Sequence, residues 1–169
     1  MLNSSAPQNG AQQQSFQRHI VLAVEDAETS KRAVAWACSE LYRQGDRFHF
    51  THVLTERPKS STTAISHYAS MRQQPNVNDQ ELIDRAIAVM METYGPLAAE
   101  GNIPVAFDIV LPADKGETVG AALHRRVKQL NSPAIVMARS TKPSKPTHIG
   151  AATKHVLENC WEAVNIIKH

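Results

Sequence analysis

"HIVLAVEDAETSKRAVAWACSELYRQGDRFHFTHVL", residues His19–Leu54, decides the fold class of this chain. It opens with a nearly continuous apolar and β-branched run, which is typical of a strand covered on both faces. The apolar residues then follow a helical stripe, and a second aromatic and β-branched run closes the stretch. A strand, a helix and another strand in this order predict a βαβ unit with parallel strands.

The same alternation continues to the end of the chain. The predicted strands are His19–Val24, Arg47–Leu54, Pro104–Leu111, Ala134–Ala138 and Ala163–Lys168. Helical stripes lie between them. The predicted fold class is therefore α/β, an open five-stranded parallel sheet with helices on both faces, Rossmann-like in architecture.

Capping and breaking residues predict where the helices begin and end. Thr29 or Ser30 offers an N-cap for the first helix, and Gly45 is a stop signal. The second helix is expected to begin near Asn78–Asp79, to be kinked or interrupted at Gly95-Pro96, and to end at Gly101. The third begins at about Thr118 and the fourth near Gly150.

Composition and charge exclude several function classes. The chain has 169 residues and a formal net charge of only +2, with its basic residues spread along the sequence, which argues against a nucleic-acid binder. It has no apolar run long enough to span a membrane and no secretory signal, so no membrane contact and a cytoplasmic location are predicted. Residues 1–17 are polar and Gln-rich and are predicted to be a disordered tail, followed by one domain over 18–169.

A ligand site is expected at the carboxyl ends of the strands, as in other open α/β sheets. Four segments would collect there: Glu25–Glu28, Thr55–Val77, Pro112–Gly116 and Arg139–Ile149. The second of these is long, has no clear pattern, and is rich in Ser, Thr, Pro and Gln. A segment of that kind is either functional or mobile.

Two stretches carry a family resemblance. "IVLAVEDAETSKRAVAWA" (Ile20–Ala37) and "AIVMARSTKPSKPTHIGAATKHVLENCWEAVNIIK" (Ala134–Lys168) resemble the universal stress protein (UspA-like) family. Ala33, Trp36 and Ala37 keep the family's pattern in the first helix. The resemblance covers Arg18–His169 and implies the adenine-nucleotide α-hydrolase-like fold. It also implies a homodimer formed through the last strand.

Several residues depart from the family's nucleotide-binding pattern. Glu25 stands where the family has an Asp that contacts adenine and ribose, Ala138 and Thr141 replace two loop glycines, and Ala151 replaces a hydroxyl residue that meets phosphate. Gly150 keeps the third glycine, and the later hydroxyl is also kept. The candidate nucleotide-binding residues that the resemblance implies are Ala23, Glu25, Val53, Met137, Ala138, Thr141, Gly150, Ala151, Ala152 and Thr153.

The physical effect of these departures is to weaken a phosphate cradle. Side chains at 138 and 141 restrict the close backbone approach that glycine permits, and prolines at 143 and 146 remove two N–H donors. Each lost hydrogen bond costs roughly 1 kcal/mol. In the other direction, Gly150 opens a helix, helix N-termini attract anions, and Arg139, Lys142 and Lys145 add positive charge.

Three hypotheses for the function follow. The first is a non-catalytic, homodimeric stress-response protein that binds no cofactor and acts through unidentified protein partners. The second is an ATP- or AMP-binding module, or weak ATPase, that holds adenine at Val53, Met137 and Ala138 and phosphate on the backbone of Ala151 and Ala152. The third is an enzyme of the wider adenine-nucleotide α-hydrolase-like fold. This chain has no Ser-Gly-Gly-like loop after the first strand, which such an enzyme is expected to have. The first hypothesis is preferred.

Other polar residues predict ordinary structural roles. His49 and His52 face opposite sides of a strand and are expected to be sheet residues. His124, Arg125 and Arg126 are expected on an exposed helix face. His148 and His155 could approach the loop, but His148 is expected to be a loop residue and His155 a helix-surface residue. Cys38 and Cys160 are expected to be reduced on apolar helix faces, Cys160 with no base nearby. Trp161 is expected to close over the core or to lie at an interface. No catalytic residue is predicted. No metal ligand is predicted either, because no Cys/His cluster has zinc spacing.

Overall fold

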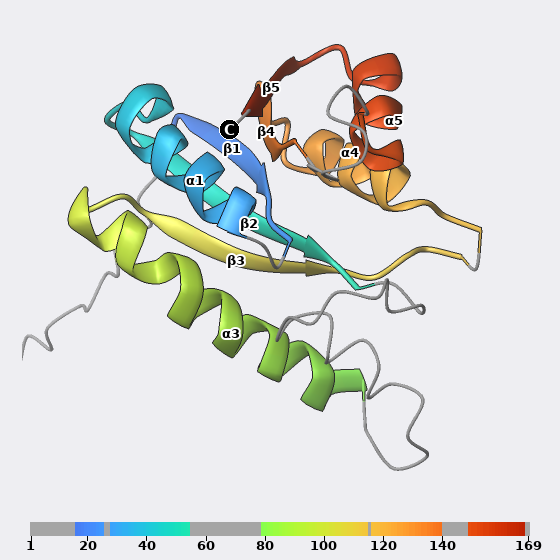
Figure 1. The fold of residues 1–169 in the computed structure, drawn as a ribbon, viewed down its shortest axis with the longest axis horizontal. Helices are drawn as coiled ribbons and strands as arrows, with labels where there is room; N and C mark the ends of the chain where they lie inside the picture. Colours follow the sequence, from blue (N-terminus) through green and yellow to red (C-terminus); the bar gives the residue numbers. More distant parts are fainter. Residues whose placement is uncertain (1–15, 26–27, 55–78, 115, 140–148, 168–169) are drawn as a thin grey trace, which may run out of the picture.

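The structure is a computed structural model that describes residues 16–25, 28–54, 79–114, 116–139 and 149–167. Its centre is a five-stranded parallel sheet in the order β3-β2-β1-β4-β5 (Figure 1). The strands are β1 (Arg18–Ala23), β2 (Asp46–Val53), β3 (Val105–Val110), β4 (Ala134–Ala138) and β5 (Ala163–Ile167). The predicted fold class is confirmed, and each strand lies within one residue of its predicted bounds.

Helices cover both faces of the sheet (Figure 1). One face carries α1 (Glu28–Trp36), its short π-helical continuation η1 (Ala37–Leu41), and the long helix α3 (Asp79–Glu100). The other face carries α4 (Val119–Gln129) and α5 (Ala151–Asn159). Within the described residues, no helix combines the length and the apolar character that crossing a membrane requires.

Alternating strand residues divide the core into two clusters, one on each face of the sheet. Ile20 and Leu22 of β1 are buried with Val34 of α1 and Tyr94 of α3. Val21, between them in sequence, points to the opposite face and is buried with residues of α4 and α5. Because β1 is central and fully covered, it reads as the continuous apolar run that the sequence shows.

The start and end of the first helix differ from the prediction. Thr29 and Ser30 are not N-caps, because α1 begins at Glu28 and both residues lie in its first turn. Ser30 is buried, and its hydroxyl accepts a hydrogen bond from the backbone N–H of Glu25 at 3.0 Å. Gly45 does not end the helix either. The helical segment stops at Leu41, and Gly45 lies in the turn before β2 at φ 94°, a value that favours glycine.

α3 is one continuous helix of 22 residues, so the interruption predicted at Gly95-Pro96 is not found. Proline in a helix leaves one carbonyl without its usual partner. Gly95 makes the site more permissive, because it has no Cβ to clash with the proline ring. The helix starts at Asp79 and gives way to a turn at Gly101, as predicted, and Asn102 in that turn has φ 50°.

α4 and α5 begin where the sequence predicts and pack tightly against each other. The hydroxyl of Thr118 caps α4 by accepting a hydrogen bond from the N–H of Ala121 at 3.2 Å. Gly120 of α4 lies against α5, where an added Cβ would be 2.6 Å from Cβ of His155 and 2.9 Å from the carbonyl oxygen of Ala152. The two helices therefore approach each other at a point where only glycine fits.

Residues 1–15 of the predicted tail and the long segment Thr55–Val77 lie outside the described residues. The last two residues of that tail do contact the domain. Phe16 lies edge-on to the ring of His19, with the guanidinium of Arg47 5.1 Å from its centroid. The N–H of Gln17 donates to the carbonyl of Gly45 at 2.9 Å. Phe16 and Gln17 therefore pack against the domain.

Candidate functional site

The strand order creates a topological switch point between β1 and β4. The chain leaves β1 through α1 toward β2, whereas β4 is reached from β3 by a crossover through α4 on the opposite face. Ala23 and Met137 are paired at the ends of these two strands. In open α/β sheets a ligand crevice forms at this position, outside the carboxyl ends of the strands. The switch point between β1 and β4 therefore lies at the edge of the sheet where the sequence predicts a ligand site.

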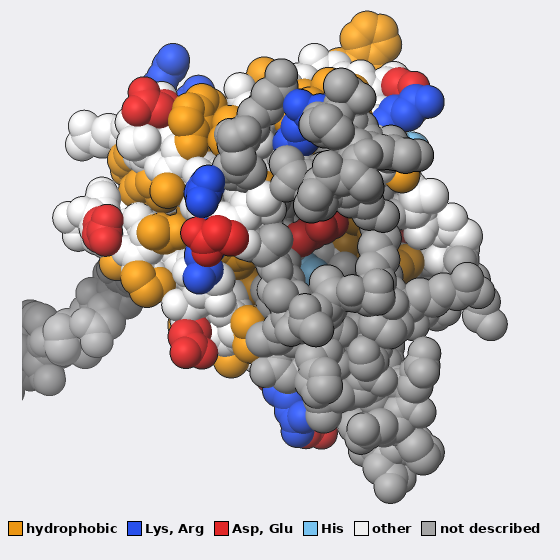
Figure 2. All heavy atoms as spheres, viewed as in Figure 1, with side chains coloured by type: hydrophobic (Ala, Val, Ile, Leu, Met, Phe, Trp, Pro, Cys, Tyr) orange, Lys and Arg blue, Asp and Glu red, His pale blue; other side chains and the backbone are white. Residues whose placement is uncertain are grey.

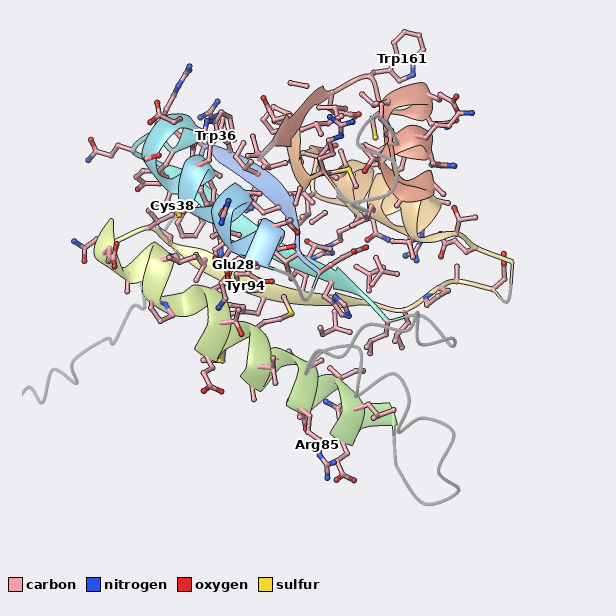
Figure 3. All side chains as sticks on the ribbon, in the orientation of Figure 1. Glu28, Trp36, Cys38, Arg85, Tyr94 and Trp161 are labelled. Atoms are coloured by element: carbon pink, nitrogen blue, oxygen red, sulfur yellow. The ribbon has the colours of Figure 1, made fainter. Side chains whose placement is uncertain are left out.

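The backbone after β1 is held from two sides. The N–H of Glu25 donates to the hydroxyl of Ser30, and its carbonyl accepts a hydrogen bond from the hydroxyl of Tyr94. Figure 3 shows Tyr94 on α3, from which it reaches this strand end. The side chain of Glu25 is exposed. The backbone that carries this carboxylate is thus held at the carboxyl end of β1, where the negative charge repels an anionic ligand.

The residues predicted to hold adenine are mostly part of the core. Val53 is 7% exposed and Met137 is 5% exposed, and both belong to the apolar cluster under α4 and α5. Ala23 is half-buried beside them, whereas Ala138, the next residue of β4, packs against the core cluster on the opposite face of the sheet. The side chains of Ala23, Val53 and Met137 form an apolar floor at the strand ends, which has the right chemistry for a flat base and no group to orient it.

Among the described candidate residues, those at the N-terminus of α5 are the ones that the family resemblance assigns to phosphate binding. Gly150 is its N-cap at φ −60° and ψ 152°, a conformation that other residues also adopt, and no described side chain caps the helix. Ala151 is exposed and Ala152 half-buried, whereas Thr153 is buried at 5% exposure. The retained hydroxyl is therefore enclosed in the protein. Thr141 lies outside the described residues.

Three half-buried arginines in the described chain are already paired with carboxylates. Arg18 forms a double hydrogen bond to Asp46, Arg126 binds Asp108, and Arg125 binds Glu117. The Arg125 guanidinium and the N–H of Ala113 lower the pKa of Glu117 to about 2. On the face seen in Figure 2, basic and acidic side chains of the described residues are interspersed, with no continuous basic surface.

The prediction that residues 124–126 lie on an exposed helix face is wrong. Arg125 and Arg126 are half-buried because α4 packs close to the edge of the sheet, where Glu117 and Asp108 meet them. His124 is also half-buried, and its Nε2 is enclosed. His155 packs beside His124, with 6.4 Å between the ring centroids. His148 lies outside the described residues.

A buried polar chain crosses the sheet beneath α4. His19 Nδ1 lies 2.8 Å from His49 Nε2, and His49 Nδ1 lies 2.9 Å from Oδ2 of Asp108. Arg126 donates to the same carboxylate oxygen at 2.7 and 3.1 Å. The sequence predicts no more than an ordinary sheet residue at His49. Its partners, on other strands, are far away in the sequence and leave no local pattern. We define these four residues as the His–Asp–Arg chain.

A groove along the edge strand β3 was not predicted. It has a volume of about 350 Å³, and α3, β3 and α4 line it. Its walls are mixed: Ile83 and Ile87 of α3 and Phe107 of β3 contribute apolar surface, and Arg125 and Arg126 contribute polar surface. Since both guanidinium groups are neutralised by carboxylates, the groove offers no uncompensated charge for an anion.

Cys160 and Trp161 differ from their predicted surroundings. Cys160 follows α5 as its C-cap and is half-buried, close to His124 and Glu162, so it does have a potential base nearby. Trp161 is 96% exposed and does not close over the core. Figure 3 shows its ring pointing away from the body of the protein. The remaining prediction, that Trp161 lies at an interface, is consistent with that exposure.

Comparisons with known proteins agree on one family. The model of the universal stress protein family matches residues 17–168. No curated protein gives a significant sequence match. Among solved structures, the chain is similar to universal stress protein UspA from Lactobacillus plantarum at 16% identity and a TM-score of 0.63, covering 90% of this chain and 98% of that one.

Two further similar structures contain nucleotides. A universal stress protein from Archaeoglobus fulgidus in complex with dAMP is 13% identical, with a TM-score of 0.59 and coverage of 90% of this chain and 99% of that one. A universal stress protein in complex with cAMP is 14% identical, with a TM-score of 0.58 and coverage of 89% and 96%. At these identities the likeness establishes the shared fold.

Proposed function

The chain belongs to the universal stress protein family, and from this premise we propose that it is a non-catalytic stress-response protein with an impaired nucleotide site. It acts in the cytoplasm, as a homodimer and through protein partners. Sheet order and helix placement keep the framework of the family, whereas the side chains at the switch point no longer supply what a nucleotide needs.

One observation carries this proposal. Among the described candidate residues, no side chain offers an exposed hydrogen-bond donor to a phosphate or a ribose. Thr153 has the one side-chain hydroxyl among them, and it is buried. Glu25 accepts hydrogen bonds, and its negative charge opposes a phosphate. Among the described candidate residues, a phosphate would find backbone N–H groups alone, without the charge-assisted bonds that make phosphate sites strong.

The alternative is an ATP- or AMP-binding protein with an atypical phosphate loop. It is favoured by the N-terminus of α5, which no side chain of the described residues caps and whose first N–H groups, at Ala151 and Ala152, have no helical acceptor. The apolar floor of Val53 and Met137 would hold the base. The dAMP and cAMP complexes of similar proteins also point in this direction.

Thermal unfolding with millimolar ATP, ADP, AMP and cAMP plus magnesium separates the two hypotheses. A ligand at about 100 times its dissociation constant stabilises the folded state by about 2.7 kcal/mol, which raises the melting temperature by several degrees. We expect no such rise for the wild-type chain, since the described site lacks side-chain donors. A rise of that size would contradict the proposal and support the alternative.

A double variant tests whether the missing side chains are the reason. Glu25→Asp with Ala151→Ser restores the acid and the hydroxyl that the family resemblance assigns to these positions. We expect this variant to gain a nucleotide-dependent rise in melting temperature. The matched control is Ala99→Ser, the same change at an exposed position of α3, which is expected to gain none. A double variant that stays unresponsive would place the defect in the loop rather than at these two residues.

The homodimer is proposed to form through β5, an edge strand of the sheet. Trp161, directly before this strand, is 96% exposed, and Leu157 of α5 is 43% exposed. Large exposed aromatic residues are enriched at interfaces between proteins. Trp161→Lys is therefore expected to shift the chain from dimer to monomer in sedimentation velocity. Met91→Lys, at another exposed apolar residue on α3, should leave the dimer intact. A monomeric wild-type chain would rule the dimer out.

A further inference from the structure

Three potential metal ligands converge where α5 ends. His124 comes from the middle of α4, Cys160 is the C-cap of α5, and Glu162 directly precedes β5. Each offers one ligand atom, and the three atoms lie within 4.8 Å of one another. We define these residues as the His–Cys–Glu cluster. Because all strands run parallel and β5 begins here, the cluster lies at the amino edge of the sheet, opposite the candidate nucleotide site.

Two atoms of the cluster are buried without a hydrogen-bond partner among the described residues. They are Nε2 of His124 and Oε2 of Glu162. A buried polar group left unpaired costs about 1–3 kcal/mol, and native proteins seldom contain one without a reason. Both residues also place a ligand atom within 4.8 Å of the Cys160 thiol, and they do so from different elements. A cation bound by the three side chains would give these buried polar groups a partner.

The surrounding fold holds the cluster in place and favours positive charge. The close contact at Gly120 fixes α5 against α4, one turn before His124. The ring of His155 packs beside that of His124. Cys160 ends α5, and the C-terminus of a helix carries partial negative charge that attracts cations. The three ligands are therefore set on packed elements and are not carried by a long loop.

The chemistry of the three ligands selects a class of metal. An imidazole nitrogen, a thiolate sulfur and a carboxylate oxygen form the mixed set that zinc accepts, with a fourth position for water. Magnesium and calcium prefer oxygen ligands throughout and fit poorly. Thiolate and carboxylate together supply two negative charges, which balance a divalent ion once the thiol proton has left to solvent.

We propose that His124, Cys160 and Glu162 bind one divalent transition-metal ion, with zinc preferred, at the amino edge of the sheet. The bound ion links α4 to the turn between α5 and β5. It stabilises the folded chain and leaves one coordination position open. This site does not depend on the nucleotide-binding question.

Cobalt is the spectroscopic probe for the test, because it replaces zinc and reports its ligands. The full-length chain is freed of metal with a chelator and titrated with cobalt chloride, then with zinc chloride. We expect one ion per chain, visible absorption bands typical of tetrahedral cobalt, and a thiolate-to-cobalt charge-transfer band that zinc removes. Cobalt should also quench the fluorescence of Trp161, which lies between two of the ligands.

Single variants assign the site. Cys160→Ser, His124→Gln and Glu162→Gln are each expected to weaken zinc binding by at least about tenfold, and Cys160→Ser to abolish the charge-transfer band. The matched control is Cys38→Ser, which removes the other cysteine, in η1 on the opposite face, and should keep the band. Circular dichroism verifies that each variant is folded.

A further variant tests whether a nearby positive charge weakens metal binding, and its expected result is a gain of affinity. Lys128 is exposed on α4, and its charge acts on both His124 and Cys160. Lys128→Gln removes a positive charge from the surroundings of the ion and is expected to tighten zinc binding severalfold. Absence of the charge-transfer band in the wild-type chain would overturn the proposal. So would a band that persists in Cys160→Ser and disappears in Cys38→Ser.

Discussion

Asp108→Ala is expected to lower the free energy of unfolding by about 3 kcal/mol, because it removes the acceptor at the centre of the His–Asp–Arg chain. The carboxylate accepts hydrogen bonds from Arg126 at 2.7 and 3.1 Å and lies 2.9 Å from His49 Nδ1. His49 is 5% exposed and cannot exchange its partner for water. Arg126 is 26% exposed, so water can solvate its guanidinium when Asp108 is removed. The expected loss of stability is therefore at the lower end of the range for broken buried ion pairs.

The arrangement also fixes one proton. Asp108 accepts a hydrogen bond from His49 Nδ1, so that nitrogen carries a proton, and the tautomers of the two rings set which one donates between His49 Nε2 and His19 Nδ1. Burial lowers the pKa of His19, and the nearby His49 and Arg47 lower it further, which disfavours the charged form of the His19 ring. Loss of Asp108 would therefore disturb a sequence of hydrogen bonds that extends across β1, β2 and β3.

Denaturant unfolding followed by circular dichroism measures the effect of Asp108→Ala. Glu158→Ala is the control, since Glu158 pairs with Lys154 on the surface, where the two side chains are 60% and 69% exposed. Its loss is expected to cost less than about 1 kcal/mol. A value for Asp108→Ala within about 0.5 kcal/mol of wild type would show that the chain of polar groups contributes nothing to stability.

The effect of Asp108→Ala is also expected to depend on pH. Burial raises the pKa of Asp108, but hydrogen bonds from His49 and Arg126 outweigh burial and bring the pKa below its ordinary value. A carboxyl group with a lowered pKa in the folded state stabilises the fold above its ordinary pKa, about 3.9. This stabilisation is lost as the pH falls toward the folded-state pKa. The difference between wild type and variant should therefore be constant near neutrality and shrink below about pH 4.

Gly120→Ala is expected to lower the free energy of unfolding by about 2 kcal/mol, as an overpacked contact does. In an exposed helix this substitution would stabilise by up to about 1 kcal/mol. At this position the new methyl group would meet Cβ of His155 at 2.6 Å and the carbonyl oxygen of Ala152 at 2.9 Å. A backbone oxygen cannot rotate away, so α5 as a whole must move.

Gly95→Ala in α3 is the control for Gly120→Ala. An added Cβ at Gly95 meets nothing within 4 Å. Because Gly95 precedes Pro96, the gain in helix propensity is partly offset, and the change should stay within about 0.5 kcal/mol of wild type. Both variants are measured by denaturant unfolding. If Gly120→Ala instead stabilises the chain, α4 and α5 do not pack as closely as the structure shows.

The fold was predictable from the sequence because local patterns carry it. The apolar runs at β1 and β4 and the helical stripes of α3 and α4 are readable within a short window, and the parallel order follows from their alternation. Thr118 was identified as a helix start because a cap acts on residues that follow it directly. Ser30 was misassigned for the opposite reason, since its hydroxyl binds backwards to the end of β1.

The polar contacts were not predictable, because their partners lie far apart in the sequence. Nothing local to Asp108 indicates that His49 and Arg126 will meet it, and no spacing rule joins His124 to Cys160. The requirement for glycine at position 120 comes from α5, which packs against it from a distant part of the sequence. The position of the candidate nucleotide site followed from topology, whereas the burial of Thr153 depends on packing and required the structure.

The placement of β1 at the middle of the sheet has a consequence for how the chain is made. One side of β1 pairs with β2, which follows soon after, but the other side pairs Val21 with Ile135, far along the sequence. During synthesis, that side of an apolar strand has no partner until the last part of the chain emerges. Distant pairing of this kind slows folding and leaves an open strand edge on which nascent chains can aggregate. Synthesis of β4, which covers that side of β1, therefore ends the period in which the nascent chain most needs a chaperone.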